Sequence, residues 1–452
     1  MRIGFVATRL AGVDGVTFET AKWEIVIGRM GHEARLLAGE IDALRPNARL
    51  VPAMHFTYPQ AARVTAAAFD PDSDAAAVRH EIDRLAGQLV PVIQDWIEVQ
   101  QIELLIVENA WAIPMHLPLA VALRRIVEAT GLPAIGHHHD YWWERERFAG
   151  CIVPEVLEAA FPPDLPNVRH VSINSLAAAQ LRRRRGIASS VMPNVFDFST
   201  HRPRPHPAVR QQLREEIGMG KRGLLVVQPT RVVPRKGIEL AIELVGRLRD
   251  RHAVLLITSP AGDEGLDYLV ELERLAERHG VRLSYAADRF APDMEGKPPK
   301  PAHSLHDAYL AADLITYPSL YEGYGNALVE AIYYGKPVLV NRYSVYDADI
   351  RPLGFRFIEI SGAITPETVR QVRAALANPR RQAVIARHNF ELGRQHLSYD
   401  LLQRRLGRWI GKLTLRVRRP GPVNVRWSSA SAGSRSSTVG PPGPVEFPSG
   451  EP

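Results

Sequence analysis

The sequence predicts two doubly wound α/β domains, each built on a parallel β-sheet with helices on both faces. Short apolar runs alternate with longer helical segments along most of the 452 residues, as in βαβ folds. A proline-rich stretch at 191–207 interrupts this alternation, and a second alternating series follows it. The chain is also too long for one hydrophobic core.

The first domain is expected to span residues 1–200. Its apolar runs are short, continuous and bounded by polar or turn residues, which is typical of buried strands. Periodic segments at 18–31 and 117–131 predict helices that cover the sheet. The expected strands are 3–8, 34–39, 103–110, 133–138 and 170–174.

The second domain is expected to span residues 201–384, after a linker formed by the prolines of 191–207. Open sheets of this kind bind ligands outside the carboxyl ends of their strands, so the site should lie in a cleft between the domains. The expected strands are 223–231, 253–259, 282–289, 313–319 and 337–343.

The remaining segments are predicted from their composition. A helical stretch at 390–413 suggests that residues 385–416 form C-terminal helices returning toward the first domain. Residues 417–452 are rich in Pro, Gly and Ser, which predicts a disordered tail. The proline- and lysine-rich segment 291–304 is expected to be a mobile loop.

Composition favours a moderately basic, soluble enzyme of the cytoplasm. The single cysteine, Cys151, excludes an intramolecular disulfide and fits a reducing compartment. The N-terminal stretch does not have the pattern of a secretory leader, so we expect none, and we find no uncharged run long enough for a membrane span. The net charge of +7 is compatible with nucleic acid, anionic lipid or anionic small molecules, and charge alone does not choose among them. We expect no nucleic-acid partner. The basic run 181–185 reads as a solvated helix end.

Two cations mark the loop after the first strand of the second domain. Arg231 and Lys236 flank this loop, and Gly237 opens the next helix. Cations at a helix N-terminus suit a diphosphate. The alternative is that both are ordinary surface cations at a turn.

The segment 321–337 reads as a glycine corner followed by a short helix. Asn326 is the expected N-cap, and Gly335 is expected just past the helix C-terminus. Gly323 and Gly325 would let main chain approach a ligand closely. The alternatives are a solvated loop position for the preceding Glu322, and helix packing or an ion pair for Glu330 on the helix.

Five features in order resemble the family 4 retaining glycosyltransferases, which have the two-domain GT-B fold. The stretch "YEGYGNALVE" resembles their E-x7-E signature, and "RVVPRKG" is similar to their R-x4-K-G loop. "VMPNVFDF" resembles their interdomain P-N-x-x-D, and "HHHD" their histidine at a strand end. Residues 12–33 resemble their glycine loop and first helix. The resemblance extends to about residue 413.

The resemblance implies a role for each matching residue. Arg231 and Lys236 would neutralise the donor diphosphate, Glu322 would hold the donor sugar, and Glu330 would bind the ribose. His139 would lie beside the reacting sugar, with Asp140 supporting it. Together with those side chains, the implied donor-binding set is Gly12, Gly15, Gly323, Tyr324, Gly325 and Asn326.

The reaction implied is retaining hexosyl transfer from a nucleotide-diphosphate sugar to a hydroxyl acceptor, in carbohydrate biosynthesis. Cations and helix N-terminal amides would stabilise charge on the leaving phosphate, which would take the acceptor proton. No divalent metal is obligatory in this scheme. Departures from the family pattern at Thr230, 258–265 and 286–300 leave the base open between UDP, GDP and ADP.

The passage 136–148 is the candidate acceptor site. Trp142 or Trp143 could stack on a sugar, and Arg145 and Arg147 would suit a carboxylated or phosphorylated acceptor, with Asp140 nearby. On a strand, His137 and His139 share one face and His138 takes the other. We expect no metal here, because no further ligand cluster is evident in the sequence.

Other readings stay open at this stage. The D-x-D at 347–349 matches a metal motif of a different glycosyltransferase fold, and we read it as coincidence. Another GT-B nucleotide-sugar enzyme, such as an epimerase or a phosphorylase, is the nearest alternative. A non-catalytic nucleotide-sugar or polyanion-binding protein is the other. The sugar, the acceptor, the oligomeric state and peripheral membrane contact are not determined.

Overall fold

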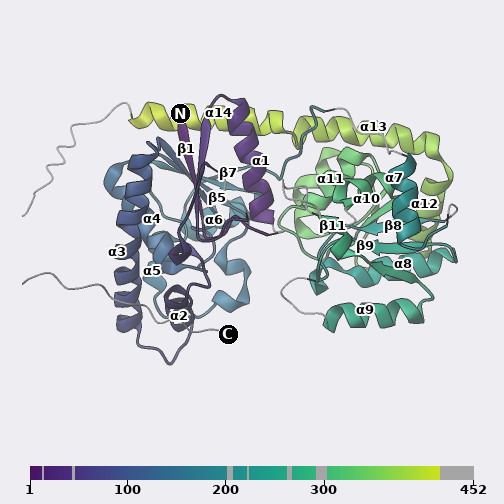
Figure 1. The fold of residues 1–452 in the computed structure, drawn as a ribbon, viewed down its shortest axis with the longest axis horizontal. Coiled ribbons are helices and arrows are strands. Elements are labelled where there is room, and N and C mark those ends of the chain that lie inside the picture. Colours follow the sequence, from purple (N-terminus) through teal and green to yellow (C-terminus); the bar gives the residue numbers. More distant parts are fainter. Residues whose placement is uncertain are drawn as a thin grey trace, which may run out of the picture.

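The computed structural model describes residues 1–12, 15–42, 46–200, 207–220, 223–261, 267–291 and 303–417. It contains two α/β domains side by side, each with its own parallel sheet (Figure 1). The two doubly wound domains predicted from the sequence are therefore confirmed. All but the first residue of the predicted tail lies outside the described residues, as does most of the predicted loop 291–304.

The first sheet has seven parallel strands in the order β3-β2-β1-β4-β5-β6-β7. All five predicted strands are present, and the sequence missed only two three-residue edge strands, β3 and β7. The strands are β1 (Arg2–Ala7), β2 (Glu33–Ala38), β3 (Ala48–Leu50), β4 (Leu104–Glu108), β5 (Ala134–His138), β6 (Val168–Ser172) and β7 (Ser189–Val191). The helices are α1 (Gly15–Arg29), α2 (Pro59–Ala68), α3 (Ala75–Val99), α4 (Leu117–Thr130), α5 (Pro154–Ala160) and α6 (Ser175–Arg185).

The second sheet has six parallel strands in the order β10-β9-β8-β13-β14-β15, of which the sequence missed only β15. The strands are β8 (Leu225–Gln228), β9 (Val254–Ile257), β10 (Arg282–Tyr285), β13 (Leu314–Tyr317), β14 (Val338–Asn341) and β15 (Ile358–Ile360). A separate two-stranded pair joins β11 (Phe290–Ala291) and β12 (His303–Ser304). The helices are α7 (Pro207–Glu216), α8 (Ile238–Leu248), α9 (Asp267–Arg278), α10 (Leu305–Ala311), α11 (Asn326–Tyr334) and α12 (Pro366–Ala377).

Each sheet is buried on both faces, which explains why its strands are continuous apolar runs. In the first domain, α3, α4 and α5 supply the core on one face. Its other face is covered by α1 and by α14, a helix from the far end of the chain. The second sheet has a similar pair of cores.

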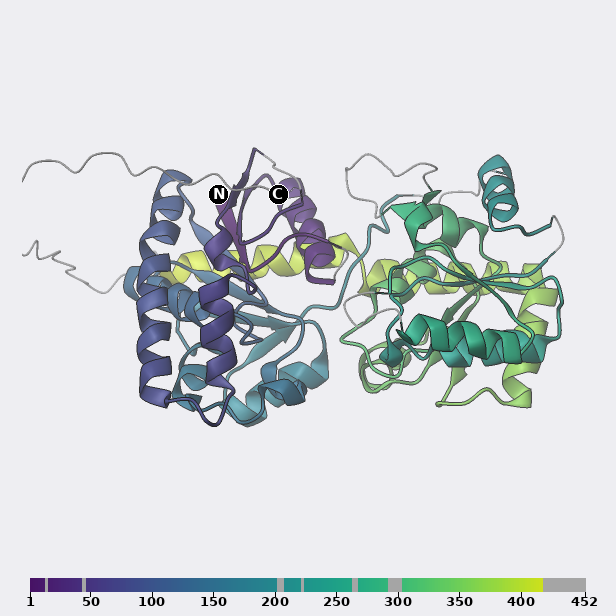
Figure 2. The same cartoon turned by 60° about the horizontal axis from the view of Figure 1, so that its bottom comes forward.

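The C-terminal stretch forms two helices, α13 (Pro379–His396) and α14 (Tyr399–Val417). Leu397 and Ser398 separate the two helices. Phe196 of the linker donates its backbone N–H to the Leu397 carbonyl at 2.9 Å. The helix α14 then crosses to the first domain, where Trp409 lies 6.4 Å from Trp23 between ring centroids. Figures 1 and 2 show α13 along the second domain and α14 along the first.

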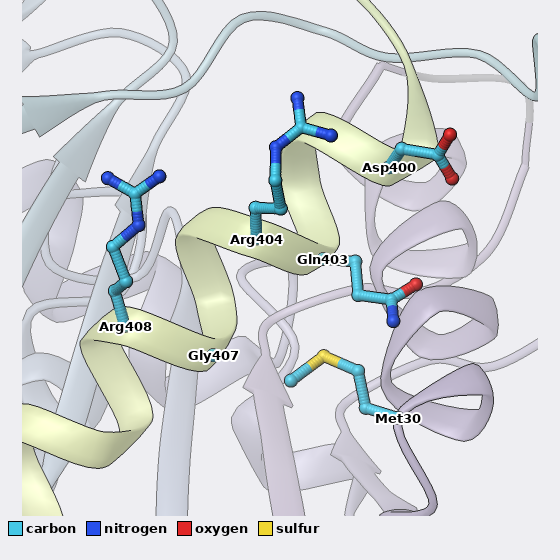
Figure 3. A pocket seen from close by; sticks show the side chains of 6 residues that line it. All are labelled: Met30, Asp400, Gln403, Arg404, Gly407 and Arg408. Atoms are coloured by element: carbon cyan, nitrogen blue, oxygen red, sulfur yellow. The ribbon is translucent and has the colours of Figure 1, made fainter.

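A hollow lies between the end of α1 and the exposed side of α14 (Figure 3). Only residues of these two segments line it, namely Met30, Asp400, Gln403, Arg404, Gly407 and Arg408. None of them belongs to the predicted site. None of the described helices combines the length and apolar character that a membrane span requires.

Candidate active site

In the second domain, the loops after β8 and β13 meet at the carboxyl edge of the sheet. Gly237 has a φ of +59°, and a Cβ there would lie 2.5 Å from the Pro318 carbonyl oxygen. This close approach brings the turn Pro234–Lys236 against the segment that carries Glu322. The Lys236 ammonium donates to Glu322 Oε1, and Arg235 Nη1 donates to its Oε2 at 3.2 Å.

Glu322 is therefore a buried, ion-paired carboxylate. Only 7% of the residue is exposed. Burial alone would raise its pKa, but Lys236 and Arg235 hold the pKa below its ordinary value. The alternative of a solvated loop residue is wrong, and so is the reading of Lys236 as a surface cation.

Arg231 and Glu330 lie in the same part of the second domain but are not members of the Lys236–Glu322 ion pair. Arg231 is half-buried in the loop after β8, close enough to Lys236 for their like charges to act on each other. Glu330 is half-buried on α11, where it hydrogen-bonds with the Tyr309 side chain.

The glycines of the corner are required by the protein itself. A Cβ on Gly323 would lie 3.0 Å from Ile173 Cδ1 and 3.3 Å from the His139 carbonyl oxygen, both in the first domain. Gly325 has a φ of +124°, and a Cβ there would lie 2.8 Å from the Tyr317 hydroxyl. The first domain therefore approaches main chain at the corner where a ligand was expected.

The predicted N-cap is wrong. The helix α11 begins at Asn326, its N-cap position is Gly325, and no side chain caps it. Asn326 Oδ1 instead accepts a hydrogen bond from Lys22 Nζ of α1 at 3.0 Å. Gly335 does end the helix, in the left-handed conformation with a φ of +63°, as predicted.

The N-terminal glycines lie at the start of α1. Gly12 donates its N–H to Asp42 Oδ2 at 2.7 Å. Gly15 opens the helix, and a Cβ there would lie 3.9 Å from Asn326 Nδ2. Gly15 therefore faces the second domain, while residues 13–14 between the glycines lie outside the described part of the chain.

At the carboxyl edge of the first sheet, the three histidines take the predicted faces. His138 Nε2 lies 2.9 Å from His170 Nδ1 on one side. On the other side, His137 Nδ1 lies 2.9 Å from Glu108 Oε2, and His139 Nε2 lies 3.5 Å from the same oxygen. Glu108 was missed by the sequence analysis. The available signal was a charged residue at the end of a wholly buried strand, LLIVE.

The sequence analysis expected no metal because it found no further cluster of ligands, and that reason is wrong. Glu108, His137 and His139 each place one ligand-type atom within 4.8 Å of the others. The sequence could not show this grouping because Glu108 is 29 residues away from His137.

In the predicted acceptor loop, two of the chosen residues are partners of each other. Arg145 forms an ion pair with Asp140 and is itself exposed. Arg147 is exposed and stacks over the Phe148 ring, 4.7 Å from its centroid. Neither arginine is buried.

The two tryptophans of the loop differ in their surroundings. Trp142 packs against two hydrophobic clusters of the first domain, and Trp143 packs against one of them. Trp143 is stacked on Tyr141 with ring centroids 4.6 Å apart, and the guanidinium of Arg184 lies 5.6 Å from its ring. Arg184 comes from the basic run that the sequence analysis assigned to a solvated helix end, and it adds a third exposed cation near this loop.

Polar contacts cross the domain boundary beside these residues. Asn174 Nδ2 donates to the Gly323 carbonyl at 2.8 Å, and the Tyr321 hydroxyl donates to Glu144 Oε2 at 3.0 Å. Asp349 Oδ2 accepts the N–H of Ser175, the first residue of α6, at 2.7 Å. The second aspartate of the D-x-D thus joins the domains, and among the described residues no candidate metal cluster includes it.

Known proteins resemble both the sequence and the fold. A family model described as glycosyl transferases group 1 matches residues 209–387. Mannosylglucosylglycerate synthase of Thermotoga maritima is 30% identical over 448 residues, covering 90% of this chain and 99% of the relative. The chain belongs to the group 1 glycosyltransferases. The family 4 resemblance and the predicted enzyme class are thereby confirmed.

Other relatives agree with this glycosyltransferase assignment. Mannosylglucosylglycerate synthase of Petrotoga mobilis is 31% identical over 388 residues, covering 80% of this chain and 86% of the relative. Sucrose-phosphate synthase of Thermosynechococcus elongatus has a TM-score of 0.66 at 13% identity, covering 92% of this chain and all of its own. HepE of Anabaena with UDP-glucose has a TM-score of 0.62 at 14% identity, covering 91% of this chain and all of its own. These two structures support the GT-B fold.

Proposed function

We propose that this glycosyltransferase transfers a hexose from a nucleotide-diphosphate sugar to a glycoside of glycerate, with retention of anomeric configuration. The observation that carries the proposal is the alignment with a mannosylglucosylglycerate synthase over 99% of that protein. Its name describes a product containing mannose, glucose and a carboxylate. A mannosyl donor and an anionic glucosylglycerate acceptor follow from that name.

The donor half of the site is the carboxyl edge of the second sheet. Arg231 and Lys236 neutralise the diphosphate, with the amides at the start of α11 as further donors. Glu322 holds sugar hydroxyls beside Gly323, Tyr324 and Gly325. Glu330, which lies on α11, binds the ribose. Lys236 then bridges the Glu322 carboxylate and the phosphates, because its ammonium carries three N–H donors.

The acceptor half is the loop after β5. Arg147 and Arg184 are exposed cations near Trp143, and they attract the glycerate carboxylate. Trp143 is the ring assigned to the sugar, because it packs against one hydrophobic cluster where Trp142 packs against two. Arg145 contributes through its pair with Asp140, which in turn orients the chain around His139.

We infer retention from the family resemblance, and the charged groups suit it. The Glu322 carboxylate is held by two cations, so it is a poor nucleophile toward the anomeric carbon. The acceptor hydroxyl attacks from the face on which the diphosphate leaves, and the leaving phosphate oxygen takes its proton. Charge on that phosphate is stabilised by the fixed cations. This scheme uses no metal ion, and with Cys151 as its one thiol the enzyme is assigned to the cytoplasm.

The test is a transfer assay over a panel of donors and acceptors. UDP-, GDP- and ADP-hexoses are combined with glucosylglycerate, glycerate and a neutral glucoside, with and without EDTA. We expect one donor base to dominate and the carboxylated glucoside to be preferred. The anomeric coupling constant of the product, measured by NMR, should match that of the donor. An inverted product, or equal use of the neutral glucoside, would contradict the proposal.

The relationship to named synthases favours transfer over the alternatives of an epimerase, a phosphorylase or a non-catalytic binding protein. An epimerase would consume the donor without an acceptor. The same panel detects this outcome as a new nucleotide sugar formed in the absence of glucosylglycerate.

A further inference from the structure

The end of β4 contacts the end of β5 through two consecutive side chains, Glu108 and Asn109. In the register of the parallel pair, Glu108 stands beside His137. Its Oε2 lies 2.9 Å from His137 Nδ1 and 3.5 Å from His139 Nε2. One carboxylate oxygen therefore faces both imidazoles.

Asn109 holds the main chain of the same segment. It has a φ of 57°, and it donates its N–H to the His137 carbonyl at 2.9 Å. Its side-chain oxygen accepts the His139 N–H at 3.0 Å, and its Nδ2 donates to Asp140 Oδ1 at 3.1 Å. This backbone conformation is uncommon outside glycine, and asparagine is among the residues that tolerate it.

The carboxylate of Glu108 is fully buried and charged. Its side chain has no exposed surface. Burial opposes ionisation, but His137 and His139 lower its pKa to about 2. An ionised carboxylate at this depth requires a compensating positive charge. The two imidazoles are the groups in contact that can supply one.

We propose that Glu108 and Asn109 are positioning residues for His139, with Glu108 keeping its ring protonated and oriented and Asn109 fixing its backbone. The proposal rests on the proposed function, in which His139 lies beside the reacting sugar. The His139 carbonyl already lies against Gly323 of the donor half. An imidazolium at this point adds a cation on the first-domain side of the site, opposite Lys236 and Arg231.

The other charged groups around His139 act in the same direction. Burial opposes its protonation, but Glu108, with Glu19 of α1 and Asp140, raises the pKa of His139 above its ordinary value. Glu19 is itself paired with Lys22 Nζ at 2.5 Å, and Asp140 is paired with Arg145. Glu108 is thus the carboxylate in direct contact that no Lys or Arg neutralises.

The surroundings of His137 set it apart from His139. Its ring stacks on Trp23 with centroids 4.1 Å apart, inside the core. Only 1% of its side chain is exposed, against 10% for His139. Of the two histidines in contact with Glu108, His139 is the one that can reach a ligand.

A direct test measures the ionisation of His139 in the full-length protein. Histidine labelled with 13C at Cε1 is titrated by NMR, and the His139 signal is identified by its loss in His139→Asn. We expect Glu108→Gln to lower the His139 pKa by about one unit or more, since a contacting opposite charge shifts a pKa by about 1–3 units. Glu108→Asp, which keeps the charge, should lower it less. An unchanged His139 pKa in Glu108→Gln overturns the proposal, whether or not the enzyme transfers mannose.

A kinetic test then separates positioning from folding. A protonated histidine with a raised pKa is lost as pH rises through that pKa, so transfer should decline on the alkaline side. Glu108→Gln should move this decline to lower pH by about one unit. In the His139→Asn background the same substitution should have no further effect on kcat/KM.

Two results would overturn the proposal in this kinetic test. One is a uniform loss of activity in Glu108→Gln with an unmoved pH profile, which indicates a structural role. The other is stoichiometric binding of Zn²⁺ or Mn²⁺ that is lost in Glu108→Gln, with activity abolished by EDTA. That second result would make Glu108, His137 and His139 a metal site. Wild-type protein that transfers no sugar to any acceptor refutes the proposed function, while the NMR titration still tests Glu108.

Discussion

Glu322 and Glu108 are the two buried carboxylates at the facing sheet edges, and they differ in what neutralises them. Glu322, at the edge of the second sheet, is held by Lys236 and Arg235. Glu108, at the edge of the first, is held by two histidines. Lysine and arginine stay charged across the physiological range, whereas histidine does not.

The difference assigns pH sensitivity to one domain. The donor half of the site should keep its charges near neutral pH, because Glu322 opposes the lowering of the Lys236 pKa by burial. The first-domain half should lose its positive charge as His139 deprotonates. Donor affinity and catalytic rate should therefore respond differently to pH. The predictions below test this contrast from the largest expected effect to the smallest.

The largest effect is expected for Glu322→Gln, which removes the carboxylate from the donor half. We expect kcat/KM to fall by about 100-fold or more, comparable to the loss of other preorganised groups that stabilise a transition state. Because Lys236 would remain buried without its partner, stability should also fall by about 3 kcal/mol. Transfer assays and thermal melts measure the two effects.

The matched control is Asp347→Asn, an exposed carboxylate of the same domain that is paired with Arg342. It should change neither kcat/KM nor the melting temperature appreciably. Wild-type turnover by Glu322→Gln would remove Glu322 from the site.

Arg231→Ala tests whether donor binding depends on a fixed cation. We expect the Kd for the nucleoside diphosphate, measured by calorimetry, to rise about 10-fold or more, as for loss of a charge-assisted hydrogen bond. The rise should be similar at about pH 7.5 and about pH 8.5, because the terminal phosphate, whose second pKa is about 6, keeps its charge over that range. Arg342→Ala, at an exposed arginine of the same domain, is the control. An unchanged Kd in Arg231→Ala argues against the diphosphate role, and a Kd ratio that depends on pH breaks the comparison between the two halves.

Asp349→Asn should weaken the contact that brings the two halves together. The carboxylate accepts from both the backbone N–H and the hydroxyl of Ser175. We expect the donor KM to rise about 3- to 10-fold, on the order of one to two lost hydrogen bonds. Activity should be insensitive to added Mn²⁺. If Asp349→Asn instead created or abolished a metal requirement, the D-x-D would have to be reconsidered.

The smallest effect is expected for Glu144→Gln, at a second titrating group of the first domain. Burial is the main cause that raises the pKa of Glu144 to about 7. The folded state therefore retains a proton that the unfolded chain releases above its ordinary value of 4.5, so stability should fall as pH rises from there to about 7. Glu144→Gln should reduce the drop in melting temperature between pH 5 and pH 8 by a few degrees. Glu146→Gln, at an exposed neighbour, should leave that drop unchanged.

Most of the fold could be predicted because it depends on local patterns. Buried parallel strands are apolar runs with clear ends, and ten of them were identified in this way. The three strands missed in the two large sheets, β3, β7 and β15, are only three residues long, too short for a pattern to stand out. The place where α13 ends and α14 begins is not a local pattern, because it depends on Phe196 of the linker, which forms an isolated bridge with Ser398.

The candidate site shows the same difference between local patterns and contacts that are distant in sequence. The residues of the loop 231–237 and the corner 321–330 were identified because each group is contiguous and includes glycine. Their pairing was not predictable, because Lys236 and Glu322 are 86 residues apart. The sequence gives only one weak signal for Glu108, namely an acidic residue at the end of an apolar strand. At Asn326 the sequence signal was misleading. Its side chain has the chemistry of an N-cap, but its Oδ1 accepts a hydrogen bond from Lys22 across the domain boundary.

The sequence by itself determined the two-domain architecture, the family and the segments proposed for the donor half, because these depend on local periodicity and contiguous motifs. Only the tertiary structure decided which charges neutralise each other and which glycines face the other domain. Those properties depend on strand register and domain packing. Gly323 illustrates this difference. Its place in the motif could be identified from the sequence, whereas its close approach to the His139 carbonyl depends on how the two domains pack.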